Sequence, residues 1–246
     1  MPKRQLVWDG CVNVRDLGGH PADDGRETRF GAVVRADNVR RLSDDGWRQL
    51  VEHGVRRIVD LRFQAELDDD PPCDVPVEVV HVPLLGERER AREVDELAKH
   101  IDEPVAWRST IYLEFLERFP ANFARAVAAV ARAPAGTVLI HCAGGVDRTG
   151  LVAALLLRVA GVGVETIAAD YAESEQNWAP FVDAWIEEAE DDEERRHRRL
   201  LALMPAEAML VVLEELEARH GSTRSYLLKA GLEEADLVDV RARLLR

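Results

Sequence analysis

The pattern of apolar and polar positions divides the chain into a mixed first half and a helical second half. Short strands and turns are predicted at the start, at residues 6–8 and 13–19. Short apolar runs rich in β-branched residues predict buried strands at residues 32–35, 55–61, 77–82 and 137–141. Between them, apolar residues recur with helical spacing, which predicts helices over 43–53, 88–101 and 105–132.

Helical patterns dominate after residue 150. Residues 151–160 are apolar almost all the way round, which predicts a buried helix. Further helices follow to the C-terminus, with Gly221 and Gly231 as C-terminal caps and Ser222 as an N-cap. This order of elements predicts an α/β domain with helical additions. The chain shows no internal repeat and no Gly/Ser linker, so we expect one domain over residues 1–246.

One helical segment, residues 187–199, is acidic first and basic second. Its charges form i,i+4 pairs in the favourable orientation, each worth about 0.2–0.5 kcal/mol: Asp191/Arg195, Asp192/Arg196 and Glu194/Arg198. Two interpretations stay open. The segment is either an ordinary helix with a solvated face or part of a mobile helical cover, around residues 180–205, over a functional site.

Composition narrows the class of protein. The 246 residues are 47% hydrophobic and 32% charged, as in soluble globular proteins, and no apolar run approaches the roughly 20 residues that cross a membrane. The net charge of −14 argues against a nucleic-acid partner and against a stable association with anionic membranes. Any phosphate-bearing partner must therefore be held by a local positive site. The N-terminus lacks the apolar segment of a signal peptide, so we expect a cytoplasmic location.

The cysteines and histidines limit the kinds of site. Cys11, Cys73 and Cys142 are widely spaced and include no Cys-x-x-Cys pair. This excludes a disulfide framework and a cysteine zinc site, and it suits a reducing compartment. The histidines share no metal-ligand spacing, so no metal is expected. We interpret Cys11 and Cys73 as structural, with a redox partner for Cys142 as the alternative.

The segment His-Cys-Ala-Gly-Gly-Val-Asp-Arg-Thr-Gly, residues 141–150, joins the last predicted strand to the buried helix. A loop that enters a helix N-terminus points several backbone N–H groups into one concavity, where the helix dipole favours an anion. Gly144 and Gly145 let the backbone curl closely, and Arg148 offers paired donors for a phosphoryl group. The same setting favours a cysteine thiolate, so Cys142 is a candidate nucleophile. The alternative is a small buried cysteine beside an arginine in a surface ion pair.

The spacing Cys142-x5-Arg148 resembles the active-site signature of protein tyrosine phosphatases. The segment Asn-Val-Arg-Asp-Leu-Gly-Gly, residues 13–19, is similar to the Asn-Phe-Arg-Asp-x-Gly-Gly motif of a bacterial tyrosine phosphatase family that includes the mycobacterial phosphatase B type. Further motifs of that family fit in the expected order at residues 35–37, 60–62 and 170–175. The resemblance covers nearly the whole chain. It implies a single tyrosine-phosphatase-like (dual-specificity-like) domain with a central, mainly parallel sheet flanked by helices.

The resemblance and the local chemistry together assign roles in the loop. Cys142 is expected to attack phosphorus and form a cysteinyl-phosphate, while Arg148 holds the equatorial oxygens and stabilises the transition state. The backbone of the residues between them completes the phosphate-binding cradle, namely Ala143, Gly144, Gly145 and Val146. Phosphoryl transfer to a thiolate needs no cofactor.

Each of the other candidate residues has two possible roles. Thr149 is expected to hydrogen-bond Cys142 or to make an ordinary N-cap contact, and His141 to support the loop or to be a satisfied buried histidine. No Trp-Pro-Asp precedes Cys142. Asp147 is therefore, as the resemblance suggests, the first candidate for the general acid, with fixation of the loop as its alternative. Asp60, at the end of a predicted strand, is the second candidate.

Three further positions are relevant to substrate binding and substrate preference. Arg62, beside Asp60, is a candidate for substrate contact. Arg15 is expected either to pair with Asp16 and hold the N-terminal turn or to contact the substrate. Val146 stands where the family loop has Lys, which removes a positive charge and counts against phosphoinositide hydrolysis.

We therefore expect a cysteine-dependent phosphomonoester hydrolase. Its expected substrates are phosphotyrosine-type phosphoproteins, and the same site would also suit a dual-specificity phosphatase. The alternatives are a phosphatase for phosphoinositides or small phosphate monoesters, and a catalytically silent phosphate-binding module. Retention of both Cys142 and Arg148 counts against the silent module.

Overall fold

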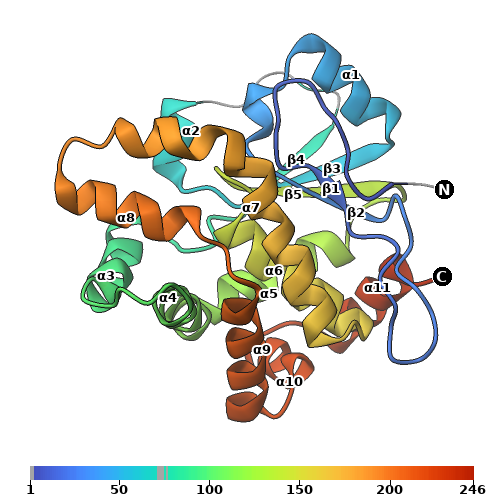
Figure 1. Cartoon of the computed structure of the whole chain (residues 1–246). Coiled ribbons are helices and arrows are strands. Elements are labelled where there is room, and N and C mark those ends of the chain that lie inside the picture. The colour runs from blue at the N-terminus through green and yellow to red at the C-terminus, as the bar shows by residue number, and fades with distance from the viewer. Residues whose placement is uncertain (1–2, 71–74, 76) are drawn as a thin grey trace.

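A five-stranded sheet lies at the centre of the computed structural model, which describes residues 3–70, 75 and 77–246 (Figure 1). The strands follow the spatial order β1-β2-β5-β3-β4. Only the short edge strand β1 is antiparallel to its neighbour, and the other pairs are parallel. The strands are β1 (Arg15–Asp16), β2 (Val33–Ala36), β3 (Val55–Asp60), β4 (Glu78–His81) and β5 (Thr137–His141).

Helices cover both faces of this sheet and build the second half of the chain (Figure 1). The bounds are α1 (Asp44–Glu52), α2 (Gln64–Asp69), α3 (Arg88–Ala98), α4 (Pro104–Arg118), α5 (Pro120–Ala131), α6 (Asp147–Ala160), α7 (Val164–Glu187), α8 (Asp192–Ala202), α9 (Ala206–His220), α10 (Thr223–Lys229) and α11 (Glu234–Leu244). A 3-10 turn, η1 (Val39–Arg41), follows β2. This arrangement confirms the mixed α/β class with a mainly parallel sheet.

The strands are apolar on both faces because each face is covered. In β5, Leu139 packs into the cluster on the α1 side of the sheet, whereas Ile140 packs into the larger cluster that contains α5 and α6. Neighbouring residues of a strand point to opposite faces, so a strand buried on both sides reads as a continuous apolar run. Helix α6 is likewise apolar almost all round, because the sheet, α5, α7 and α11 surround it.

Several predicted boundaries are wrong in informative ways. The helix predicted over 105–132 is two helices, because Pro120 has no N–H for an intrahelical bond and begins α5 after a break at Phe119. The strand predicted at 6–8 is not formed, although the backbone N–H of Leu6 donates to Val14. The short helix α2 was not predicted.

The charged segment over 187–199 is also not one helix. Helix α7 ends at Glu187, and Asp191 caps α8 by accepting from the backbone N–H of Glu194. Of the three predicted i,i+4 pairs, Glu194–Arg198 is formed, while Arg195 pairs with Asp192 and Arg196 with Asp102. Figure 1 shows α7 crossing the molecule and α8 returning beside α4.

Two other predictions concern single features. Ser222 caps α10 as predicted and Ser43 caps α1, each accepting from a backbone N–H three residues on. Cys73 lies outside the described residues. Within the part of the chain that is described, no helix combines the length and the apolar character needed to span a bilayer.

Candidate active site

The loop that follows the central strand β5 defines the site, and residues 142–148 are called the 142–148 loop below. Parallel strands carry their functional groups at their carboxyl ends, and β5 is the strand in the middle of the sheet. Gly145 has φ +67°, and a Cβ on it would lie 2.5 Å from the carbonyl oxygen of Ala36 at the end of β2. Only glycine fits at this position, because the loop turns directly against the neighbouring strand.

The carbonyl groups of this loop point outward and are held by neighbouring segments. Ala143 O accepts from the backbone N–H of Asn38 at 2.9 Å, and Gly145 O accepts from Arg35 at 2.8 Å. Gly144 O accepts from the Asn13 amide and from the indole N–H of Trp178. The backbone N–H groups of 143–148 donate to no other described residue. They are therefore free to bind an anion at the N-terminus of α6.

The two signature side chains occupy opposite ends of the loop. Cys142 is 2% exposed. The Arg148 guanidinium is held by Glu66 of α2 through two hydrogen bonds, of 2.5 and 3.2 Å, and lies 4.8 Å from the ring centre of Phe63. Burial alone would lower the pKa of Arg148, but the electrostatic influence of Cys142 and the hydrogen bonds to Glu66 raise it above its usual value. Arg148 is thus a fixed cation beside Cys142.

Asp147, at the first position of α6, belongs to a hydrogen-bonded group that the sequence did not reveal. Its Oδ1 accepts from Arg108 at 2.6 Å and from the phenol of Tyr112 at 2.6 Å. Its side chain is 39% exposed, and the residue lines the cavity described below. Asp147 is therefore oriented by α4 and accessible from the cavity.

His141, Asp60 and Arg62 form a buried group behind the loop. Asp60 accepts from Arg62 at 2.8 Å and lies 3.5 Å from the His141 ring, whose other nitrogen is 3.2 Å from the Cys142 carbonyl oxygen. Burial alone would raise the pKa of Asp60, but hydrogen bonds from His141 and Arg62 hold it well below its usual range. Asp60 is buried and ion-paired, whereas Asp147 lines the cavity, so Asp147 is the better candidate for the acid. Arg62 also pairs with Asp70, and neither Asp60 nor Arg62 lines the cavity.

The hydroxyl of Thr149 does not make its expected contact. The residue is fully buried, and its Oγ1 has no hydrogen-bond partner among the described residues. The predicted bond to Cys142 is therefore not formed in this structure.

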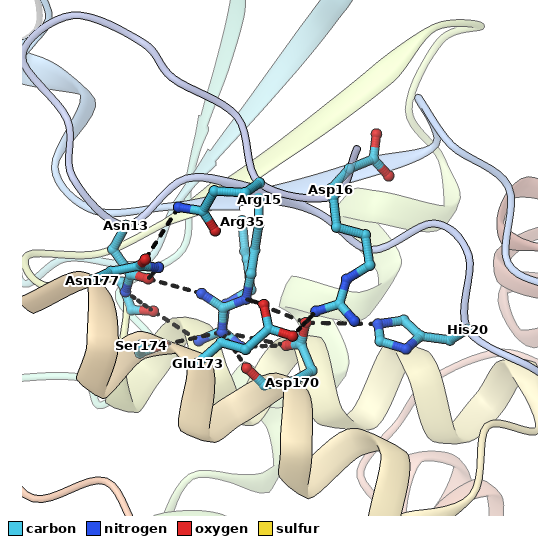
Figure 2. A network of polar contacts seen from close by, with 12 residues as sticks. Asn13, Arg15, Asp16, His20, Arg35, Asp170, Glu173, Ser174 and Asn177 are labelled. Atoms are coloured by element: carbon cyan, nitrogen blue, oxygen red, sulfur yellow. Dashed lines mark hydrogen bonds and ion pairs between the residues drawn. The ribbon is translucent and has the colours of Figure 1, made fainter. Parts of the chain in front are cut away.

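Arg15 has a different partner from the one predicted. Its guanidinium points into the interior and bonds Asn13, Ser174 and Asp170 of α7 (Figure 2). Asp16 points the other way and accepts from two backbone N–H groups of the N-terminal segment, those of Gly18 and Gly31. Consecutive residues of a strand face opposite sides, so the expected Arg15–Asp16 pair is wrong.

The network around Asp170 connects α7 to the 142–148 loop (Figure 2). Asp170 accepts from Arg15 at 3.2 Å and from Arg35 at 2.9 Å, and all three side chains are at most 1% exposed. Arg35 also holds the Gly145 carbonyl group, and Asn13 holds that of Gly144. Arg15 thus supports the loop from behind and does not line the cavity.

An apolar cavity of about 510 Å³ opens beside the loop. The loop contributes Ala143, Gly144, Val146 and Asp147 to its wall. The opposite wall comes from α7, α8 and the segment after α8, and is formed by Trp178, Phe181, Val182, Trp185, Leu201, Ala202 and Met204. Arg41 is its single basic lining residue among those described. Most residues of this wall lie in the segment around residues 180–205, and Trp178 lies just before it. In the described part of the chain, no cluster of His, Cys, Asp or Glu is arranged to hold a metal ion.

Sequence reasoning missed Glu66, Arg108 and Trp178. Glu66 carried no capping-box signal in the sequence, because the residue at the N-cap is Phe63 and not Ser or Thr, although the Glu66 carboxylate accepts from the backbone N–H of Phe63. Arg108 and Trp178 lie in helical segments far from the loop in sequence, and no local pattern distinguishes them from other helical residues.

The fold and the loop together define an α/β protein with an anion-binding site at the end of its central strand. The sequence profile of the tyrosine phosphatase family matches residues 6–246, and the chain belongs to that family. Membership of this family implies a phosphorylated substrate.

Individual relatives agree with this assignment. The chain is 32% identical to a protein of Cupriavidus necator assigned as a tyrosine-protein phosphatase, over 73% of this chain and 66% of the relative. It is 26% identical to the triple specificity protein phosphatase PtpB of Mycobacterium tuberculosis, over 96% of this chain and 97% of that protein. A tyrosine-protein phosphatase of Nostoc commune is 26% identical over 87% of this chain and 74% of its own length.

Proposed function

We propose that this protein is a phosphomonoester hydrolase that uses Cys142 as its nucleophile and acts on phosphotyrosine-type substrates. The observation that supports this most is the 142–148 loop, where outward carbonyl groups leave a row of N–H groups free beside a buried cysteine and a fixed arginine. Such a ring of donors matches the three equatorial oxygens of a phosphoryl group in the transition state of its transfer. We also propose that residues 1–246 act as one phosphatase domain.

The first step of the proposed reaction transfers the phosphoryl group to sulfur. The Cys142 thiolate attacks phosphorus, the bond between phosphorus and the leaving oxygen breaks, and Asp147 gives its proton to that oxygen. Arg148 and the loop N–H groups stabilise the charge on the equatorial oxygens. The products are a cysteinyl-phosphate and a neutral phenol.

The second step regenerates the enzyme. The Asp147 carboxylate takes a proton from a water molecule as the water attacks phosphorus, and the bond between sulfur and phosphorus breaks. Cys142 leaves as a thiolate and inorganic phosphate is released. One aspartate therefore serves first as acid and then as base, and no cofactor takes part in the proposal.

The cavity favours an aromatic leaving group. Trp178, Phe181 and Trp185 offer ring faces and edges for a phenol, and aromatic pairs gain about 0.5–1.5 kcal/mol beyond area burial. Val146 gives the loop an apolar side chain where a cation would attract additional phosphates. These features support phosphotyrosine over a multiply phosphorylated headgroup.

Steady-state hydrolysis of p-nitrophenyl phosphate and of a phosphotyrosyl peptide, without added metal, tests the proposal. We expect turnover by the wild-type protein and by Cys11→Ser, and none by Cys142→Ser. Cys142→Ser should still bind vanadate, because the loop donors remain. Turnover by folded Cys142→Ser would refute the nucleophile assignment. Vanadate binding without turnover by the wild-type protein would support the silent phosphate-binding module, and faster turnover of phosphoinositides than of the peptide would refute the substrate class.

A further inference from the structure

Arg108 of α4 is a buried arginine with every donor satisfied. Its guanidinium has five N–H groups and is 1% exposed. They meet five acceptors at 2.6–3.2 Å: the backbone carbonyl groups of Leu200, Leu201 and Leu203, the Tyr112 hydroxyl and Asp147 Oδ1. Three of these acceptors belong to the last turn of α8 and the residue after it. The same side chain therefore contacts the proposed acid and the helix that covers the cavity.

A second route reaches Asp147 from α7. The Tyr112 hydroxyl has one hydrogen, which it donates to Asp147 Oδ1 at 2.6 Å. The Tyr171 hydroxyl, 2.8 Å away, must then donate to Tyr112. Burial raises the pKa of Tyr171 to about 12 and that of Tyr112 well above its usual value, so both phenols keep their protons. Asp147 Oδ1 is thus fixed by two donors, and only Oδ2 remains to exchange a proton with a substrate.

We propose that Arg108 is a positioning residue that couples the docking of α8 to the orientation of Asp147. The inference rests on the proposed function, in which Asp147 is the general acid. When α8 is docked, its carbonyl groups hold the guanidinium so that one Nη meets Asp147. When α8 moves away, Arg108 loses three of its five acceptors and its fixed orientation. Acid catalysis is therefore fastest when α8 closes the cavity that Leu201 and Ala202 line, because Tyr112 alone holds Asp147 less firmly when α8 is displaced.

This coupling predicts a dependence on the leaving group. Expulsion of p-nitrophenolate needs little protonation, whereas phenolate is as basic as tyrosine, whose pKa is about 10. A misplaced acid of this kind can cost roughly 100-fold. We expect Arg108→Met to lower kcat/KM, which reports phosphoryl transfer to Cys142, about 10- to 100-fold for phenyl phosphate and less than about threefold for p-nitrophenyl phosphate. The later hydrolysis, in which Asp147 acts as base, is common to both substrates and does not enter kcat/KM. In an Asp147→Asn background, Arg108→Met should cause no further loss on phenyl phosphate.

Three further variants separate positioning from a general structural role. Tyr112→Phe removes one donor to Asp147 and keeps the ring, so it should show a smaller loss with the same preference and serves if Arg108→Met does not fold. Leu200→Ala loosens the packing of α8 and keeps the backbone carbonyl group that Arg108 contacts, and it should also lower kcat/KM selectively for phenyl phosphate. Arg243→Met is the matched control, because Arg243 likewise holds three backbone carbonyl groups, of Ala133, Pro134 and Gly136, away from the site. It should leave the ratio of the two activities unchanged.

The outcomes are distinguishable. If the wild-type protein hydrolyses neither substrate, the proposed function itself fails. If it hydrolyses both, equal losses on the two substrates for Arg108→Met and Tyr112→Phe, or losses additive with Asp147→Asn, overturn the positioning role. A Leu200→Ala variant that leaves kcat/KM unchanged, or lowers it equally for both substrates, overturns the coupling to α8.

Discussion

Replacing Asp170 by asparagine should strongly destabilise the protein. Asp170 is the common acceptor of Arg15 and Arg35, which are at most 1% exposed, and it also accepts from Arg4 at 2.8 Å (Figure 2). Asparagine keeps the shape and one carbonyl oxygen but removes the charge. The buried Arg35 then loses its counter-charge, and the buried Arg15 keeps only Glu173, at 3.9 Å.

The expected cost follows from this burial. Breaking a buried ion pair costs about 3–5 kcal/mol, because the remaining charge stays buried without compensation. The oxygen that asparagine retains places the expected loss near the lower end, at about 3 kcal/mol. This is a large part of the 5–15 kcal/mol that is typical of whole domains. Burial alone would raise the pKa of Asp170, but Arg15, His20, Arg35 and Arg4 hold it well below its usual range.

Urea unfolding followed by tryptophan fluorescence measures this loss. Asp236→Asn is the matched control, because Asp236 is buried while its partner Arg132 is 54% exposed and can return to water. It should cost about 1 kcal/mol or less. A pH series adds a check. The folded pKa of Asp170 lies below the unfolded one, so its contribution is present above about pH 4 and is lost as the pH falls. The wild-type advantage should shrink below that pH. A cost for Asp170→Asn no larger than that of the control would refute this reasoning.

Three further predictions test the loop. Gly145→Ala should lower the free energy of unfolding by more than about 2 kcal/mol and also lower turnover, because a left-handed φ costs about 1–2 kcal/mol and the added Cβ would lie 2.5 Å from the Ala36 backbone. The control is Gly25→Ala, where φ is +80° and no atom lies near the Cβ. In a urea titration it should show only the cost of the left-handed φ, and its turnover should be unchanged. Glu66→Gln should lower kcat about tenfold for phenyl and p-nitrophenyl phosphate alike, since it loosens Arg148 and leaves the acid in place; a loss confined to phenyl phosphate would contradict this. Val146→Lys should lower KM for phosphoinositides about three- to tenfold at low salt, with Val146→Met as the apolar control. If the lower KM persists at high salt, it does not come from the added positive charge.

The sequence predicted the elements whose signal is local. The sequence of β5 is an apolar run because all five of its residues are buried, and this run predicts a buried strand. The helix α6 is apolar almost all round because nearly all of its residues are buried, and this pattern predicts a buried helix. The cradle between them was predictable because glycines, a helix start and a Cys-x5-Arg spacing lie within one short segment. The break at Pro120 could also have been predicted, since proline begins helices far more readily than it continues them.

The supporting contacts were not predictable, because they join residues distant in sequence. Arg108 meets Asp147 across 39 positions and Arg15 meets Asp170 across 155. An arginine on a helix looks the same in sequence whether its guanidinium reaches solvent or five buried acceptors. The Arg15–Asp16 prediction failed for a simpler reason, since adjacency in a strand separates side chains rather than pairing them.

In the proposed reaction, Cys142 carries the phosphoryl group during turnover. Rapid acid quench of the wild-type protein during hydrolysis of p-nitrophenyl phosphate, followed by digestion and tandem mass spectrometry, locates that group directly. We expect a phosphate on the sulfur of Cys142, absent in Cys142→Ser and absent without substrate. Turnover with the phosphate on another side chain, or turnover that persists in folded Cys142→Ser, would contradict it.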